Sequence, residues 1–237
     1  MKILSSYKYQ ISDLRRSLAI FYGIILIIIV FAIIMDNGSA EIGGMEMASS
    51  IFIFVVGLNS FRQNFLFSLA NGVSRKTQFI AFIASISTAA CIMAIIDRIY
   101  SLVFSNFILY GSLFQQIYYR GGFNLTLNSA IMSFVWSVVF YISAAMFGYM
   151  ICLIYYRSGR IMKLVVSILP PVLVFIALPY LAMLNTDLSL KVLKFAGQIF
   201  GVYPQSFPIN AVFTFLIISL ILSFFSFLLM RRAQIKQ

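Results

Sequence analysis

Residues 18–35 read LAIFYGIILIIIVFAIIM, a run without a single charged residue. A helix needs about 20 predominantly apolar residues to cross the hydrocarbon core of a bilayer, so this run predicts a membrane span. It is also longer than the roughly 7–15 apolar residues of a secretory signal peptide. We therefore expect it to be retained, although the small residues Gly38-Ser39-Ala40 behind it leave cleavage as an alternative.

The rest of the chain continues this apolar pattern. Of its 237 residues, 62% are hydrophobic and 10% are charged, whereas soluble domains average roughly 45–50% and 25%. The candidate spans are Leu18–Met35, Ile42–Phe61, Thr77–Ile96, Leu125–Tyr155, Ile161–Leu184 and Ala211–Met230. We predict an all-α, polytopic membrane protein in which residues 1–237 form one domain with six transmembrane helices.

Two regions complicate this count. In the fifth candidate span, Pro170, Pro171 and Pro179 should kink or break the helix. Residues 99–114 form another largely apolar run. We expect an outer helix that lies on the membrane or packs over the bundle; the alternative is a seventh span, which would reverse the sidedness of the later loops.

The cations are distributed unevenly among the loops. Thirteen of the 17 Lys and Arg residues fall in the N-terminal segment, the second loop, the fourth loop and the C-terminal tail. Six spans place these four segments on one side, and the positive-inside rule then predicts a multi-pass protein of the cell membrane with both termini cytoplasmic. The net charge of +11 is thus explained by membrane lipid, not by nucleic acid.

The N-terminal residues 1–17 have an amphipathic pattern. Tyr7, Ile11, Leu14 and Leu18 recur at helical spacing, while the charged side chains fall elsewhere. We expect an interfacial helix that lies flat on the membrane and then turns into the first span. A disordered basic tail is the alternative.

The segment from Phe61 to Thr77 reads FRQNFLFSLANGVSRKT. It should continue the second span as a helix, stop at Asn71-Gly72 and restart with Ser74 as the N-cap. This predicts an amphipathic cytoplasmic segment, residues 62–76, that offers a docking site to a partner; a basic loop on phospholipid headgroups is the alternative. The candidate partner-binding residues are Asn64, Phe65, Phe67, Ser68, Asn71, Gly72, Ser74 and Arg75.

Charged residues are nearly absent from the span centres, whereas polar residues form mild stripes. Glu46 lies near the outer end of the second span, and Ser219, Ser223 and Ser226 repeat along the sixth. These four are candidate pathway or gate residues, because polar groups in lipid often have a function. The alternatives are a structural role for Glu46 and helix packing for the serines. Asp97-Arg98 is interpreted as an interfacial anchor.

The residue types argue against catalysis. The chain has no histidine and only six acidic residues, and Cys91 and Cys152 lie inside apolar runs. A metal site of His and Cys is therefore not expected. The chain also lacks the G-x-x-x-x-G-K-[ST] loop that binds nucleotide phosphates. We predict a non-enzymatic protein without a cofactor of its own.

Residues 66–76, LFSLANGVSRK, between the second and third spans, resemble permease subunits of type-2 ABC transporters from Gram-positive bacteria. The resemblance extends to the six-span architecture and the basic N-terminal helix, but the outer segment 99–124 matches no pattern of that family. It implies a homodimer, or a dimer with a paralogous permease, that exports a hydrophobic or amphipathic cargo such as a peptide, an antibiotic or a lipid. It also implies a separate ABC ATPase that binds ATP and Mg and docks at residues 62–76.

Two further expectations depend on this resemblance. The amphipathic stretch within residues 185–210 would form an outer helix that closes the pathway; a helix resting at the headgroups is the alternative. A stand-alone membrane protein without transport activity, such as a bacteriocin-immunity or sensor-partner protein, is the alternative function.

Overall fold

The computed structural model describes residues 2–35, 41–118, 127–172, 180, 186–202 and 207–231, most of which are helical. Two short strands, β1 and β2, pair in parallel. The elements in chain order are α1 (Lys2–Met35), β1 (Glu41–Gly43), α2 (Met45–Ala70), α3 (Arg75–Phe104), β2 (Leu109–Gly111), α4 (Leu113–Tyr118), α5 (Leu127–Arg157), α6 (Arg160–Val172), α8 (Thr186–Ile199) and α9 (Pro208–Arg231).

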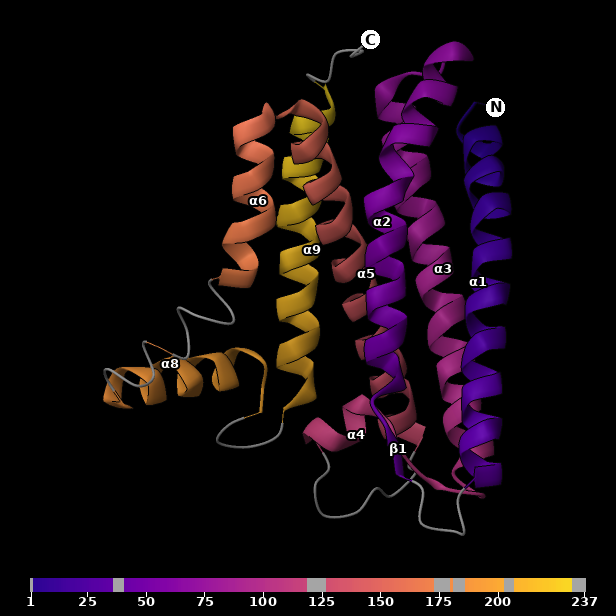
Figure 1. Ribbon diagram of the computed structural model, residues 1–237, viewed down its shortest axis with the longest axis vertical. Coiled ribbons are helices and arrows are strands. Elements are labelled where there is room, and N and C mark those ends of the chain that lie inside the picture. Colours follow the sequence, from indigo (N-terminus) through magenta and orange to yellow (C-terminus); the bar gives the residue numbers. More distant parts are fainter. Residues whose placement is uncertain are drawn as a thin grey trace.

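Five long helices form the body of the molecule. In Figure 1, α1, α2, α3, α5 and α9 run along the long axis, whereas α8 lies across it near one end. Four helical segments are long and apolar enough to cross a bilayer: Ile3–Met35, Arg75–Phe104, Asn128–Arg157 and Pro208–Arg231. The chain is therefore a helical, multi-pass membrane protein, as its composition predicts.

The other two predicted spans are less complete. The second lies in α2, whose apolar segment Met45–Phe61 is shorter than the other four. The fifth is represented by α6, which at 13 residues is about 20 Å long and does not cross a hydrocarbon core of about 30 Å. Residues 173–179 and 181–184 of that predicted span, including Pro179, lie outside the described residues.

The N-terminal segment differs from the expected interfacial helix. α1 is one helix from Lys2 to Met35 and runs beside α3 without a turn near residue 17 (Figure 1). Hydrogen bonds hold its first half against α3: Ser85 Oγ donates to Gln10 Oε1 at 3.0 Å, and the Tyr7 and Thr88 hydroxyls lie 3.0 Å apart. These long-range contacts explain why an amphipathic segment joins the bundle.

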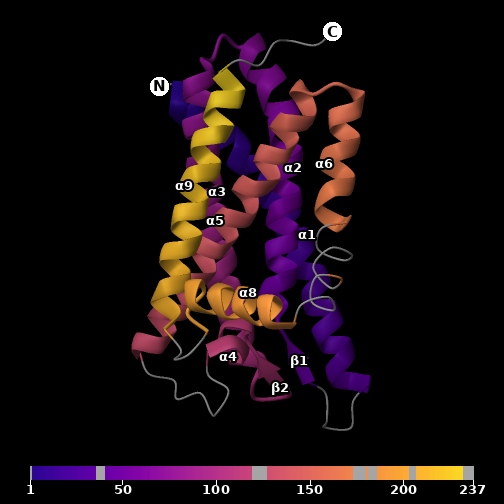
Figure 2. The ribbon, with the colours of Figure 1, turned by 90° about the vertical axis from the view of Figure 1, so that its left-hand side faces the viewer.

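The apolar run 99–114 forms neither a seventh span nor a single outer helix. Its first residues are the last turns of α3, which ends at Phe104. The remainder contains β2 and the start of α4, both near the end of the bundle that also carries β1 (Figure 2). Polar residues within the run, such as Ser105, which follows α3 as its C-cap, interrupt the apolar pattern.

Two glycines lie where α2 and α5 cross at close range. A Cβ atom at Gly57 of α2 would overlap the carbonyl oxygen of Ala145 in α5, and a Cβ at Gly148 would overlap that of Phe54. Small residues permit such close contact between helices in lipid. No prediction from the sequence pointed to this crossing.

The two ends of the bundle carry different elements. The start of α1, the α2–α3 turn, the α5–α6 turn and the end of α9 lie at one end, and the strands, α4 and α8 at the other (Figures 1 and 2). A hydrogen bond of 2.6 Å from Arg75 Nη1 to the Arg231 carbonyl joins α3 to α9 at the first end. The four cation-rich segments thus lie at the same end of the bundle, as the loop charges predict. Which end faces the cytoplasm stays a prediction.

Candidate functional site

The hairpin between α2 and α3 folds as its sequence predicts. α2 ends at Ala70, and Gly72 adopts a φ of 63°, a left-handed conformation that glycine takes without a steric penalty. The Val73 amide donates to the Ser68 carbonyl at 2.8 Å, which closes the helix end. Ser74 caps α3, because its hydroxyl accepts from the Thr77 amide at 3.2 Å.

The candidate partner-binding residues of this hairpin divide into a base and a tip. Phe65 and Ser68 are buried, so they hold the base in the bundle and are not exposed to a partner. The Phe65 ring lies against Phe61, with ring centroids 4.8 Å apart, and the Arg75 guanidinium lies 6.0 Å from the Phe65 centroid. Asn64 and Arg75 are half-buried, and the exposed candidates are Phe67, Asn71, Gly72 and Ser74.

A buried carboxylate joins four helices near the opposite end. Asp97 of α3, expected to be an interfacial anchor, is only 5% exposed. Tyr22 of α1 and Ser49 of α2 donate hydrogen bonds to Asp97 Oδ1 at 3.0 and 3.1 Å, and Tyr141 of α5 donates to Oδ2. Three hydroxyl donors satisfy this carboxylate, so Asp97 organises the helix contacts.

Glu46, a candidate gate residue, is also buried. Its carboxylate accepts the Leu113 amide at 2.9 Å, which connects α2 to the start of α4. A cavity of only about 10 Å³ adjoins Glu46, Asp97 and Arg98, which is room for about one water molecule. This geometry supports the structural alternative for Glu46.

The α9 serines do not meet Glu46. Ser226 is fully buried, and its neighbour Phe227 contacts Phe79 of α3 near the hairpin end. Ser219 and Ser223 are half-buried, and Ser219 donates to the Leu216 carbonyl within its own helix at 2.8 Å. The four candidate pathway residues therefore form no common site.

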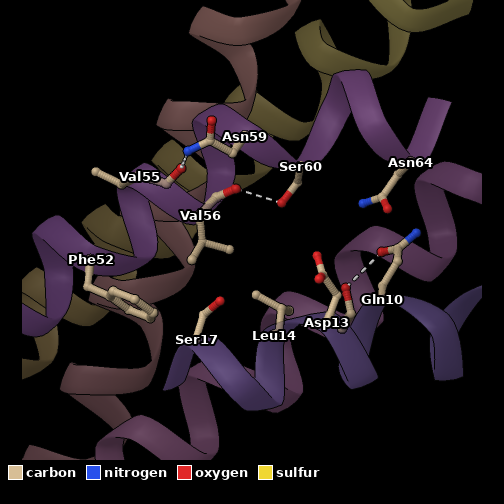
Figure 3. A pocket seen from close by; sticks show the side chains of 11 residues that line it. Gln10, Asp13, Leu14, Ser17, Phe52, Val55, Val56, Asn59, Ser60 and Asn64 are labelled. Carbon is tan, nitrogen blue, oxygen red and sulfur yellow. Dashed lines mark hydrogen bonds between the residues drawn. The ribbon is translucent and has the colours of Figure 1, made fainter. Parts of the chain in front are cut away.

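A polar pocket lies between α1 and α2 (Figure 3). Its volume is about 330 Å³, within the usual range for small-molecule sites of roughly 300–1,000 Å³. The lining residues are Gln10, Asp13, Leu14 and Ser17 of α1, Phe52, Val55, Val56, Asn59, Ser60 and Asn64 of α2, and Ser85 of α3. Of these, the sequence interpretation named only Asn64 as a candidate site residue.

A signal for this pocket is present in the sequence. On α1, Gln10, Asp13 and Ser17 recur at helical spacing, and on α2 Ser60 and Asn64 are four residues apart. The two stripes face each other only because α1 lies alongside the bundle. The prediction of a flat interfacial helix placed the first stripe in the headgroup region, so the match was missed.

The chain was compared with models of protein families, with curated proteins and with solved structures, and none of them matches it.

Proposed function

We propose that this chain is the permease subunit of an ATP-driven exporter of the type-2 ABC kind, with both termini in the cytoplasm. A separate ATPase docks on the hairpin tip, defined as Phe67 and residues 70–74. The observation that carries this proposal is the hairpin itself, a rigid helical projection with an exposed tip at the cation-rich end of the bundle. The sequence, in turn, contains no phosphate-binding loop, so the energy for transport must come from another polypeptide.

The base of the hairpin supports a coupling role. Phe65 is packed in the bundle core, and Arg75 bonds the last residue of α9. A displacement of the tip would therefore be passed to α2, α3 and α9 together, because packed helices move as rigid elements. Such a linkage is what an ATPase needs to open and close a pathway between two permease halves.

The outer helices support a dimer and an apolar cargo. α1 and α9 keep large apolar side chains exposed, among them Ile20, Phe31, Phe213 and Phe224. Lipid tails cover such apolar surfaces as readily as protein does, so these surfaces alone do not require a partner. Lipid tails do not suit the polar lining of the pocket beside α1. A second copy or a paralogous permease that packs against the pocket side of α1 would enclose a pathway for a hydrophobic or amphipathic cargo.

Co-purification from the native host tests the proposal. The tagged chain, extracted in a mild detergent, should bring with it a protein that contains a phosphate-binding loop, together with ATP hydrolysis. Ala70→Trp adds bulk to the exposed end of α2 and should abolish both. Ile34→Trp places the same exposed indole at the opposite end of the bundle, near the end of α1, where Ile34 is 73% exposed, and should leave both unchanged.

The outcome also separates the two functions. If no ATPase accompanies the wild-type chain, the stand-alone alternative replaces the transporter. If the ATPase accompanies Ala70→Trp as well as wild type, docking occurs elsewhere and the assignment of the hairpin tip is wrong.

A further inference from the structure

The pocket between α1 and α2 is closed by aromatic contacts at both ends. Tyr9 of α1 stacks on Phe67 of α2 with ring centroids 4.1 Å apart, and Phe21 stacks on Phe52 at 4.2 Å. Between these two stacks the helices are separated by the pocket (Figure 3). The two stacks therefore limit the pocket along the helices, while its side stays open at the exposed residues Asp13, Ser17 and Asn59.

Gln10 provides an unused hydrogen-bond donor in this pocket. The side chain is only 3% exposed, and its Oε1 atom accepts from Ser85. Its Nε2 atom is buried and has no hydrogen-bond partner among the residues that the structure describes. Because buried polar groups are almost always paired, Gln10 points to a ligand with an acceptor atom.

The other polar groups offer mainly acceptors. Asn59 Nδ2 donates to the Val55 carbonyl at 3.0 Å, and Ser60 Oγ donates to the Val56 carbonyl at 2.6 Å. The Ser60 hydroxyl proton and one of the two Asn59 N–H groups are thus engaged, while the oxygen lone pairs of both side chains stay available. A ligand with several donor groups suits this side of the pocket.

The charge of the pocket is negative. Asp13 is the one charged residue among the described residues that line it. Lys8 and Arg15 of the same helix are exposed, and at 3.6 residues per turn they fall on the opposite side of α1. Arg16, one turn after Asp13, is exposed beside the pocket and is not part of its lining. A cation is favoured here, and a lone phosphate or carboxylate would be repelled.

The remaining wall is aliphatic and aromatic. Leu14 and Val56 face each other across the pocket, and Phe52 closes its lower part (Figure 3). Apolar wall and polar lining together match a molecule whose polar head continues into a hydrocarbon segment.

We infer that this pocket binds the head of an amphiphile that carries a primary ammonium group and, beside it, a hydroxyl or ester oxygen. The ammonium group donates to the Asp13 carboxylate and to the oxygens of Asn59 and Ser60. The adjacent oxygen accepts from Gln10 Nε2, and the first methylene groups lie on Leu14 and Val56. Only the identification of this amphiphile as exported cargo rests on the proposed function; the binding itself needs no ATPase.

The test is photolabelling of the full chain in nanodiscs of phosphatidylcholine. The probe is sphinganine, a long-chain amino alcohol, with a diazirine on the chain close to its head. Cross-links mapped by mass spectrometry should fall within residues 10–17 and 52–64. Unlabelled sphinganine should compete at least about tenfold better than a long-chain diol or a fatty acid, because a charged hydrogen bond is lost with either.

Variants make the test specific. Asp13→Asn should weaken labelling about tenfold and remove the preference for the amine over the diol. Ser17→Phe fills the pocket without changing its charge and should also abolish labelling. Lys8→Gln, on the opposite side of α1, is the matched control and should label like wild type. The melting temperature of each variant, followed by Trp136 fluorescence, should stay near that of the unmodified chain.

Three results would overturn the inference: cross-links spread over α9, equal competition by the diol, or full labelling of Asp13→Asn. Nanodiscs doped with phosphatidylethanolamine identify the natural source of the ammonium group. Loss of labelling there assigns the pocket to a lipid headgroup, and retained labelling assigns it to a free amphiphile. Because no ATPase is present, a negative result leaves the docking proposal to its own experiment.

Discussion

Replacement of Asp97 by alanine should destabilise the bundle more than any other loss of a single carboxylate among the described residues. The side chain accepts hydrogen bonds from Tyr22, Ser49 and Tyr141, one from each of three other helices. A hydrogen bond to a charged group contributes about 1.5–3 kcal/mol to stability. Tyr22 also donates to the Met93 carbonyl at 3.2 Å, so it keeps one acceptor in the variant.

The expected loss is therefore about 4–7 kcal/mol, two full hydrogen bonds and part of a third. In a chain of this length each kcal/mol lowers the melting temperature by about 2–4 °C, which predicts a decrease of roughly 8–28 °C. Asp97→Asn retains one carbonyl acceptor and should lose about half as much. Since Trp136 is the one tryptophan of the chain, thermal unfolding in detergent can be followed by its fluorescence.

Asp13→Ala is the matched control, because that carboxylate is exposed and its removal should cost less than about 0.5 kcal/mol in the absence of ligand. Tyr141→Phe tests the same network from α5. Combined with Asp97→Asn it should cost less than the two single losses together, because the variants share one hydrogen bond. An Asp97→Ala protein that melts within about 2 °C of wild type would refute the organising role of this carboxylate.

Three further predictions concern the helix contacts and the hairpin. Gly148→Ala should lower stability by about 1–3 kcal/mol in the same unfolding assay, because the new methyl group meets the Phe54 carbonyl. Gly23→Ala, in open space on α1, should raise it by about 0.5–1 kcal/mol; equal effects of the two would contradict the close crossing. Ser74→Ala should cost about 1 kcal/mol through the lost cap of α3. Asn71→Cys, in a chain without its two native cysteines, should react with a membrane-impermeant maleimide only after cell lysis, and labelling of intact cells would invert the predicted orientation.

The parts of the fold that sequence reasoning predicted depend on local interactions. The end of α2, the left-handed Gly72 and the Ser74 cap involve residues within a few positions of one another. Such features can be predicted from the sequence because the backbone groups left unpaired at a helix end are bonded by residues a few positions away. The sixth span was predicted from Ala211, whereas α9 begins at Pro208, a residue well suited to the first turn of a helix.

The parts that were missed depend on contacts far apart in the chain. Gln10 and Ser85, whose bond holds the first half of α1 on α3, are 75 residues apart. The glycine crossing of α2 and α5 joins positions that share no local pattern. Amphipathic periodicity shows that a helix has two faces, but it does not distinguish a lipid headgroup from a neighbouring helix as the partner of either face.

The register of α1 on α3 places the pocket at a particular depth. The Gln10–Ser85 and Tyr22–Asp97 bonds link residues 75 apart and the Tyr7–Thr88 bond links residues 81 apart, so the two helices run parallel with an offset of 75 to 81 residues. The uncharged run of α1, which begins at Leu18, therefore starts near the level of Met93. The apolar run of α9 ends at Arg231, which bonds Arg75. Along the bundle axis, the start of the uncharged run of α1 and the end of the apolar run of α9 thus differ by about 18 helical residues, or roughly 27 Å.

One flat boundary between headgroups and hydrocarbon cannot match both runs. The apolar run of α9 favours a boundary close to the hairpin. The exposed cations Arg15 and Arg16 of α1 favour a boundary closer to the centre of α3, because charged side chains avoid hydrocarbon. The pocket, which reaches α3 at Ser85, lies between these two limits. A lipid-like molecule at the cation-rich face of the membrane would have its charged head at this depth and its chain in the hydrocarbon, which is the arrangement that the Asp13 carboxylate and the aliphatic wall require.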